Sequence, residues 1–101
     1  MSKVAVLAKL PVRPEAKAEF LAAFSEMEAA VANESGTEIY ILNWDSSDEN
    51  LAYIYELYTD ADALGVHSGS EAMKALMGAL GGVLAGAPEL IMLNPATGKG
   101  L

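Results

Sequence analysis

The side chains best suited to acid–base chemistry in this sequence lie close together, between residues 55 and 70. Residues 55–60 read Tyr-Glu-Leu-Tyr-Thr-Asp, and the segment that follows ends on His67, the only histidine of the chain. An imidazole titrates near neutral pH, so it can take a proton from a substrate and return it. A histidine near tyrosines and the carboxylate of Glu56 is what acid–base chemistry on a small aromatic molecule requires.

The composition excludes several other chemistries. The 101 residues are expected to form one domain, residues 1–101. Without cysteine the chain has no disulfides, no thiolate nucleophile and no cysteine ligand for a metal. With one histidine, no histidine–carboxylate metal triad is expected either.

Charge and hydropathy bear on partners and location. The chain has 14 acidic and 6 basic residues and a net charge of −8, which argues against nucleic acid and anionic membranes as partners. No apolar run approaches the roughly 20 residues that span a bilayer. The apolar start, residues 1–7, is interpreted as a strand and not as a signal peptide. We therefore expect a soluble, cytoplasmic protein.

Hydrophobic spacing predicts the first half of the fold. Residues 3–10 are nearly all apolar, which is typical of a strand covered on both faces. Pro14 suits the first turn of a helix that should run to about Asn33. One face of that helix carries Phe20, Phe24, Met27 and Val31. Residues 37–44 and 51–58 alternate as strands do, and the polar loop between them predicts an antiparallel hairpin.

The second half is expected to hold two helices and a last strand. Thr59 with Asp62, and Ser68 with Glu71, resemble the caps at which helices begin. The first helix should run through His67, and the second should end at residues 81–82, with residues 83–86 adding one more turn. Residues 88–94 are interpreted as the last strand, followed by a glycine-rich tail, residues 95–101.

This order predicts an α+β fold of the ferredoxin-like type, β-α-β-β-α-β, with an antiparallel sheet. Helices on one face of such a sheet leave the other face bare, and here that face would be a large apolar patch. Two copies packed face to face would cover it. We therefore expect a homodimer that forms a dimeric α+β barrel.

The sequence resembles the antibiotic biosynthesis monooxygenase domain, a family of dimeric α+β barrels. The similarity covers nearly the whole chain and rests on the segments Val12-Arg13-Pro14 to Phe20, Glu34-Ser35-Gly36-Thr37 with Tyr40, Tyr55-Glu56-Leu57-Tyr58, Asp62-Ala63-Leu64 to His67, and the strand after Pro88. These segments are specific for the fold and less so for the activity, because the family mixes oxygenases, haem-degrading enzymes and proteins of unknown function.

The resemblance implies a pocket between sheet and helices and oxygen chemistry without metal, flavin or nicotinamide. Triplet oxygen reacts slowly with closed-shell molecules, but an electron-rich phenolate or quinol anion can supply the electron itself. The protein then deprotonates the substrate, stabilises its anion and excludes water. By this resemblance His67 is the acid–base group or orients the substrate hydroxyl, and Glu56 orients His67. The structural alternatives are a buried histidine that caps a helix end, and a carboxylate paired with a backbone amide or a basic side chain.

Further residues of the implied pocket are proposed substrate contacts: Tyr40, Asn43, Trp44, Tyr55, Tyr58 and Met73. Strand alternation prevents all of them from lining one cavity, because Tyr55 and Tyr58 point to opposite faces. Aromatic residues are enriched in interfaces as well as in pockets, Asn43 can serve the adjacent turn, and Met73 can belong to the core.

The sequence departs from the haem-degrading members of the family. It has Leu76 near the position of their haem-ligating histidine, and the first strand lacks their asparagine.

The expected function is a cofactor-independent monooxygenase that acts with molecular oxygen on a quinol, a polycyclic phenol or a similar electron-rich aromatic. The alternatives are a non-catalytic small-molecule-binding or stress-associated barrel, and a cyclase or isomerase that uses His67 without oxygen. The tail, residues 95–101, is expected to reach the partner protomer.

Overall fold

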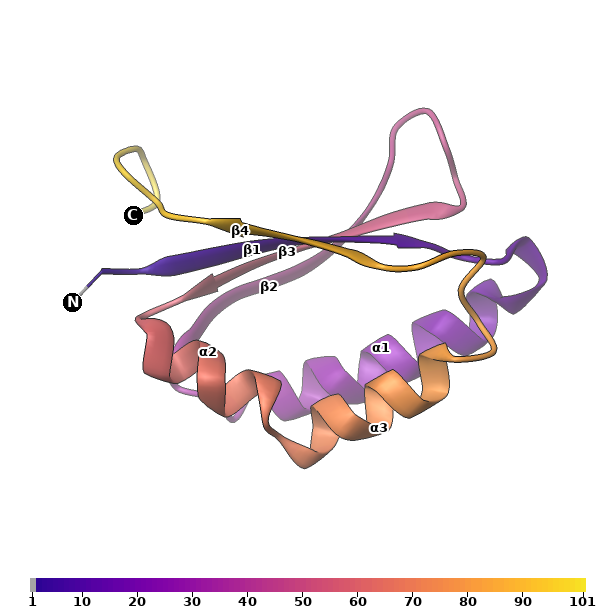
Figure 1. Cartoon of the computed structure of the whole chain (residues 1–101), viewed down its shortest axis with the longest axis horizontal. Helices are drawn as coiled ribbons and strands as arrows, with labels where there is room; N and C mark the ends of the chain where they lie inside the picture. Colours follow the sequence, from indigo (N-terminus) through magenta and orange to yellow (C-terminus); the bar gives the residue numbers. More distant parts are fainter. Residues whose placement is uncertain (1) are drawn as a thin grey trace.

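The computed structural model describes residues 2–101 as a four-stranded antiparallel sheet with helices on one face (Figure 1). In chain order the elements are β1 (Val4–Pro11), the 3-10 helix η1 (Pro14–Ala16), α1 (Lys17–Val31), β2 (Thr37–Trp44), β3 (Leu51–Tyr58), α2 (Ala61–Ser68), α3 (Glu71–Leu80) and β4 (Glu89–Leu93). This confirms the predicted α+β, ferredoxin-like fold. None of the helices in the described part of the chain is long and apolar enough to cross a bilayer.

Both predicted helix caps are displaced by one or two residues. The side chain of Asp60, not that of Thr59, accepts the backbone N–H of Ala63 at 2.8 Å and begins α2. The Thr59 hydroxyl instead donates to Glu38. A cap must place its oxygen within reach of the N–H three residues on, and only Asp60 meets that condition here.

The same rule corrects the start of α3 and the segment after it. Ser70, not Ser68, accepts the N–H of Met73 at 3.1 Å. Residues 83–86 do not add a helical turn, because Leu84 forms an isolated β-bridge with Val12. After Pro14 the chain makes a 3-10 turn first, so the α-helix proper begins at Lys17.

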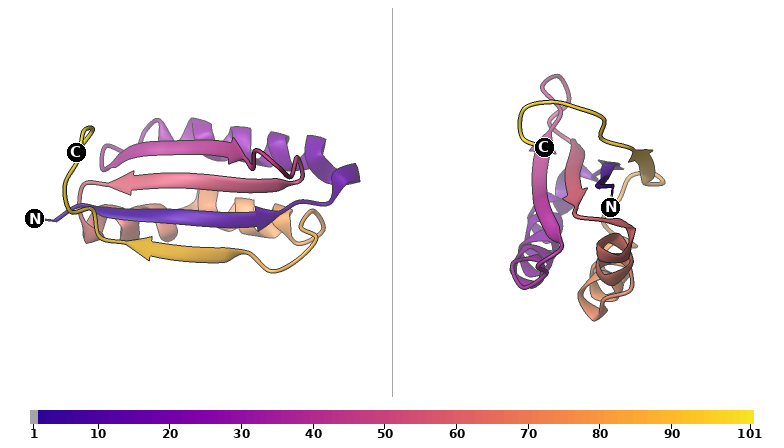
Figure 2. Two further views of the ribbon diagram at one scale, coloured as in Figure 1. Left: turned by 90° about the horizontal axis from the view of Figure 1, so that it is seen from above. Right: turned by 90° about the vertical axis from the view of Figure 1, so that its left-hand side faces the viewer.

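The sheet has the strand order β2-β3-β1-β4, with β1 in the interior between β3 and β4 (Figure 2). The register places Tyr40, Glu56, Val6 and Met92 in one row across the four strands. Side chains alternate between faces along a strand, so this row shares one face. That face carries the helices, and we call it the inner face.

The core fills the space between the inner face and the helices. Phe20, Phe24 and Met27 of α1 are buried as predicted, while Val31 is only partly buried. They pack with buried residues of the sheet and of α3, including Ala8, Leu10, Ile54, Leu76 and Leu80. When the strands are viewed end-on, α1 lies below the β2 side of the sheet, and α2 and α3 lie below the β1 side (Figure 2, right).

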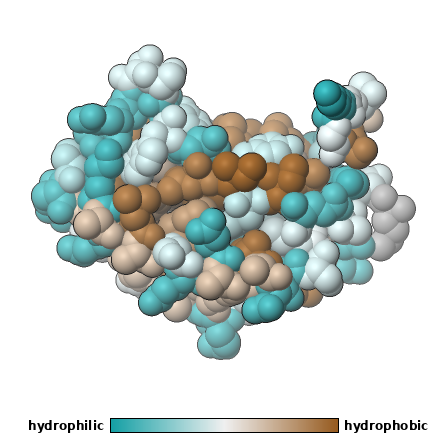
Figure 3. All heavy atoms as spheres, turned by 180° about the vertical axis from the view of Figure 1, so that it is seen from behind, coloured by the Kyte–Doolittle hydropathy of each residue, from teal (hydrophilic) through white to brown (hydrophobic). Residues whose placement is uncertain are grey.

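The other face of the sheet, the outer face, carries no helix (Figures 1 and 2). Its residues include Leu7, Ile41, Tyr53, Tyr55, Ile91 and Leu93. Ile41 is 54% exposed and Leu93 is 41% exposed. Seen from behind, where β2 and α1 are nearest, a band of apolar surface runs along the molecule (Figure 3). The chain thus leaves much apolar side-chain surface uncovered.

One glycine is required by the close approach of two segments. The turn between α1 and β2 contacts α2 at Gly36, where a Cβ atom would lie 2.4 Å from the Cβ of Ala63. The carbonyl of Gly36 also accepts the N–H of Thr59 at 2.9 Å. No real Cβ approaches another atom so closely, so a larger residue would push α2 away from the turn.

Candidate functional site

A cavity of about 310 Å³ lies between the inner face of the sheet and the helices α2 and α3. Its walls are mostly apolar, with the side chains of Val6, Ala8, Leu10, Ile54, Leu64, Leu76, Met77, Leu80, Pro88, Leu90 and Met92. The polar groups Tyr40, Glu56, His67 and Ser68 and the thioether of Met73 complete the lining. A largely apolar cavity with few polar groups is typical of small-molecule sites.

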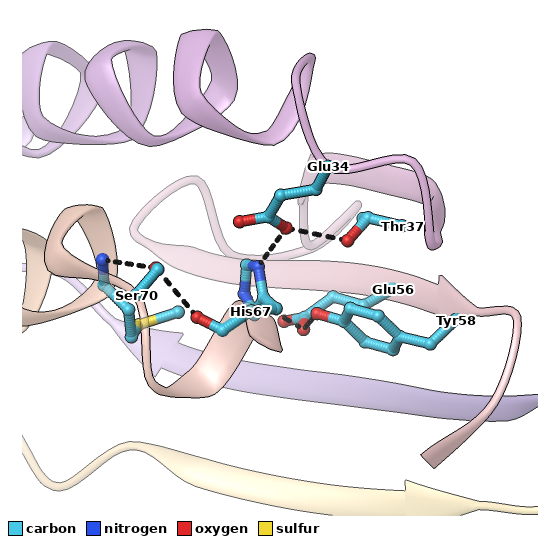
Figure 4. A network of polar contacts seen from close by, with 7 residues as sticks. Glu34, Thr37, Glu56, Tyr58, His67 and Ser70 are labelled. Carbon is cyan, nitrogen blue, oxygen red and sulfur yellow. Dashed lines mark hydrogen bonds and ion pairs between the residues drawn. The ribbon is translucent and has the colours of Figure 1, made fainter. Parts of the chain in front are cut away.

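His67 lies near the end of α2 and is only 2% exposed. Its Nδ1 lies 2.9 Å from Oε1 of Glu34, so a neutral imidazole with its proton on Nδ1 would donate to this carboxylate (Figure 4). Its other nitrogen, Nε2, is buried and has no hydrogen-bond partner among the described residues. A buried polar atom without a partner is rare and favours a role in binding or catalysis.

Glu34 is a site residue to which sequence reasoning gave no role. It lies in the turn between α1 and β2, and its Oε1 also accepts the Thr37 hydroxyl at 2.7 Å. Topology could have indicated it: β2 begins where β3 ends, so the turn before β2 and the helix after β3 meet at one end of the sheet. The contact between Gly36 and Ala63 brings these two segments together.

Glu56 and Tyr58 form a second buried pair beside the histidine. They are two residues apart on β3 and share the inner face, where the Tyr58 hydroxyl donates to Oε1 of Glu56 at 2.5 Å. That same carboxylate oxygen lies 3.9 Å from Nε2 of His67, which is too long for a hydrogen bond. The partner of Glu56 is therefore a tyrosine, not the backbone amide or basic side chain of the structural alternative.

Burial shifts the pKa values of these groups. Loss of water raises the pKa of the Glu56 carboxyl, with a further rise from Glu34, while the hydrogen bond from Tyr58 and the nearby His67 lower it. Burial is also the main cause that raises the pKa values of Tyr40 and Tyr58 well above that of a free phenol. Both tyrosines therefore keep their protons at neutral pH and can act as donors, not as bases.

Four of the predicted site residues, the histidine among them, share one cavity. Glu56, His67, Tyr40 and Met73 line the cavity. The ring centroid of Tyr40 lies 5.2 Å from that of His67. The Tyr40 ring also stacks on the ring of Phe24. Tyr58 does not line the cavity, but its ring lies 5.3 Å from the imidazole and its hydroxyl fixes Glu56.

The other three predicted contacts lie outside the cavity. Tyr55 and Asn43 are on the outer face, where Tyr55 pairs in register with Leu7 and the Asn43 amide donates to carbonyls of β2 and β3. Trp44 is on the inner face but at the far end of β2. There it contacts Phe20, and Nζ of Lys17 lies 4.4 Å from the centroid of its ring.

The arrangement is suited to moving one proton. With the imidazole proton on Nδ1, toward Glu34, Nε2 of His67 would be the acceptor for a substrate hydroxyl in the cavity. The Glu34 carboxylate would then stabilise the imidazolium that forms. Within residues 2–101 no three His, Asp or Glu side chains are grouped so as to hold a metal ion.

Comparisons with known proteins agree with this architecture. A family model described as antibiotic biosynthesis monooxygenase matches residues 3–79. The structure is similar to that of a proposed antibiotic biosynthesis monooxygenase from Caulobacter crescentus CB15, with 36% identity, a TM-score of 0.91 and coverage of 95% of this chain and 92% of that one. It is also similar to Rv0793 from Mycobacterium tuberculosis, with 26% identity, a TM-score of 0.89 and coverage of 97% and 99%. Among curated proteins, none matches the chain.

Proposed function

The chain belongs to the antibiotic biosynthesis monooxygenase family, and from that premise we propose that it oxidises a quinol, a polycyclic phenol or a similar electron-rich aromatic molecule with molecular oxygen and without a cofactor. The family and the names of similar structures support a monooxygenase. The class of substrate and the independence from cofactors are our proposal.

One observation carries the proposal: Nε2 of His67 is a buried ring nitrogen that has no hydrogen-bond partner among the described residues, and His67 lines a mostly apolar cavity. A neutral aromatic ring would fit the apolar walls, and its hydroxyl would supply the missing hydrogen bond. The nearby tyrosines hold their protons, which leaves His67 and Glu56 as bases in the cavity lining; Glu56 already accepts the Tyr58 hydroxyl, so we assign the base to Nε2 of His67.

The chemistry needs a base more than a redox group. Once its hydroxyl is deprotonated, an electron-rich ring can pass an electron to oxygen directly. For a phenol the balance is phenol + O2 → quinone + H2O: one oxygen atom enters the ring, and the other leaves as water with the two hydrogens that the substrate loses. The substrate thus supplies all four electrons. The protein contributes orientation, proton transfer and exclusion of water.

Each residue of the site has a separate role in the proposed reaction. His67 takes the hydroxyl proton at Nε2, and Glu34 holds the Nδ1 proton and stabilises the imidazolium. Tyr58 fixes the carboxyl of Glu56 beside the reacting hydroxyl. Tyr40 and Met73 form part of the wall against which the ring would pack.

Oxygen uptake tests the proposal directly. Metal-stripped protein should consume oxygen above the spontaneous rate when it is given quinols or polycyclic phenols. The product should carry one atom of labelled oxygen, since the other leaves as water. Product formed equally well under nitrogen would contradict the proposal and indicate a cyclase or isomerase. Ligands that raise the melting temperature of the protein without any turnover would indicate a binding protein instead.

We further propose that two copies pack through their outer faces. Apolar side chains such as Ile41, Ile91 and Leu93 are exposed there, and a symmetric partner would bury them. The tail, residues 95–101, leaves β4 and crosses one end of the sheet on this same face (Figure 2). Because Leu101 is 49% exposed in the single chain, we propose that the tail packs on the partner.

Deleting residues 96–101 should weaken this dimer, with a dissociation constant raised about 10- to 100-fold, because the dimer loses two tails and with them two leucines. Sedimentation over a range of protein concentrations measures the effect. The matched control is the full chain with Lys99→Ala, which changes the tail but keeps its apolar end. Equal dissociation constants for the deletion and the full chain would contradict the role of the tail.

A further inference from the structure

The described residues that line the cavity around His67 include no side chain with a permanent positive charge. None of the six lysines and arginines of the chain is among its lining residues. Four of the six have other partners: Lys3 binds Glu38, Arg13 binds Glu15, Lys74 binds Glu71, and Lys17 lies over the ring of Trp44. A ligand that carries a negative charge would therefore meet no lysine or arginine in the cavity.

The groups that face the imidazole are acids or phenols. Glu34 approaches it from the turn before β2, Glu56 and Tyr58 from β3, and Tyr40 from β2. An anion bound to Nε2 of His67 would also lie close to the Glu56 carboxyl, which is 3.9 Å from that nitrogen. Like charges at such a distance repel strongly when little water separates them, and the net charge of −8 adds to this.

The net charge of the site after binding differs between a neutral hydroxyl compound and a carboxylate. A neutral hydroxyl brings its own proton, so proton transfer to His67 yields an imidazolium and an oxyanion without changing the net charge of the site. A carboxylate brings no proton. It must either remain without a positively charged partner in a mostly apolar cavity, which is costly, or bind together with a proton taken from water.

On the basis of the function proposed above, we infer that this cavity selects uncharged molecules: it binds an aromatic hydroxyl compound in its protonated form, and it rejects carboxylate, sulfonate and phosphate derivatives of the same ring. The substrate proton is then removed after binding and not before. Acidic aromatic compounds would be excluded even when their rings fit.

Three probes with one bicyclic ring test the inference by calorimetry: 1-naphthol, 1-naphthamide and 1-naphthoate. The amide has nearly the shape of the carboxylate but no charge. At pH 8 we expect the naphthol and the amide to bind and the naphthoate to bind at least about tenfold more weakly than the amide. As the pH falls from 8 to 6, the affinity for naphthoate should rise, by at most about tenfold per unit, because up to one proton is taken up with it. The affinity for the amide should stay constant.

A pair of variants locates the source of the selection. Glu56→Gln removes the charge beside Nε2 but keeps an oxygen for the Tyr58 hydroxyl, and it should strengthen naphthoate binding at pH 8 several-fold. Glu19→Gln removes one charge from the exposed face of α1 and should leave binding unchanged. Equal gains in the two variants would contradict a local origin.

The outcomes separate this inference from the proposed function. Naphthoate that binds as tightly as the amide at pH 8, without proton uptake, would overturn the inference and leave oxygen uptake by phenols unaffected. Failure of both neutral probes to bind would also overturn it. Neutral probes that bind selectively without any oxygen uptake would support the inference and contradict the monooxygenase.

Discussion

Replacing His67 by alanine is expected to lower the turnover number for a phenolic substrate by about 10²–10⁴-fold, which is the usual contribution of a general base. In the proposed mechanism Nε2 of the imidazole, which has no hydrogen-bond partner among the described residues, accepts the substrate proton, and the two tyrosines beside it hold their protons too tightly to replace it. The measurement is the initial rate of oxygen uptake at saturating substrate, compared with the wild-type rate.

Alanine at this buried position also leaves a void, so a second variant separates chemistry from folding. His67→Gln keeps a polar group that can reach Glu34 but cannot act as a base near neutral pH. We expect it to melt near the wild-type temperature and to be as slow as the alanine variant. Turnover close to wild type in a folded glutamine variant would remove His67 from the chemistry and direct attention to Glu56.

Replacing Glu34 by glutamine is expected to lower the turnover number by about 10- to 100-fold, as is typical when the partner that orients a catalytic group is removed. The neutral amide no longer stabilises the imidazolium. It can also donate to Nδ1, which would place the imidazole proton on Nε2 and block the acceptor. Because Glu34 is not among the residues that line the cavity, KM should change little.

A lower turnover number with an unchanged KM would distinguish a role of Glu34 in positioning His67 from a general loss of structure. Glu38→Gln is the matched control, since Glu38 is also a hydrogen-bonded glutamate but binds Lys3 and Thr59. It should leave both kinetic constants unchanged. A Glu34→Gln enzyme with normal turnover and raised KM would contradict the positioning role.

Much of the fold could be predicted from the sequence because local rules decide it. The spacing of Phe20, Phe24 and Met27 identified the buried face of α1, and the alternation in residues 37–44 and 51–58 identified two strands. The caps were misplaced because several neighbouring side chains can cap a helix, and tertiary contacts choose among them. Thr59 is held by Glu38 instead, which leaves Asp60 to begin α2.

The site was harder to predict because long-range contacts assemble it. His67, Glu56, Tyr40 and Met73 were identified from residue type and from the resemblance to a family, and they do line one cavity. Glu34 is 33 residues from His67 in the sequence. Local patterns do not reveal such a pair. Trp44 was included for its chemistry, but its position along β2 takes it to the far end of the inner face.

The contact between Gly36 and Ala63 links the reactivity of the site to a residue that has no side chain. A methyl group at residue 36 would move α2 outward, and His67 would move with it, away from Glu34. Glu34 and His67 themselves would be unchanged, yet the imidazole would lose the hydrogen-bond partner of its Nδ1. Under the proposed function, a larger residue at this position would lower the reaction rate as well as the stability, and a relative with such a residue would need a compensating shift of α2 to retain the same chemistry.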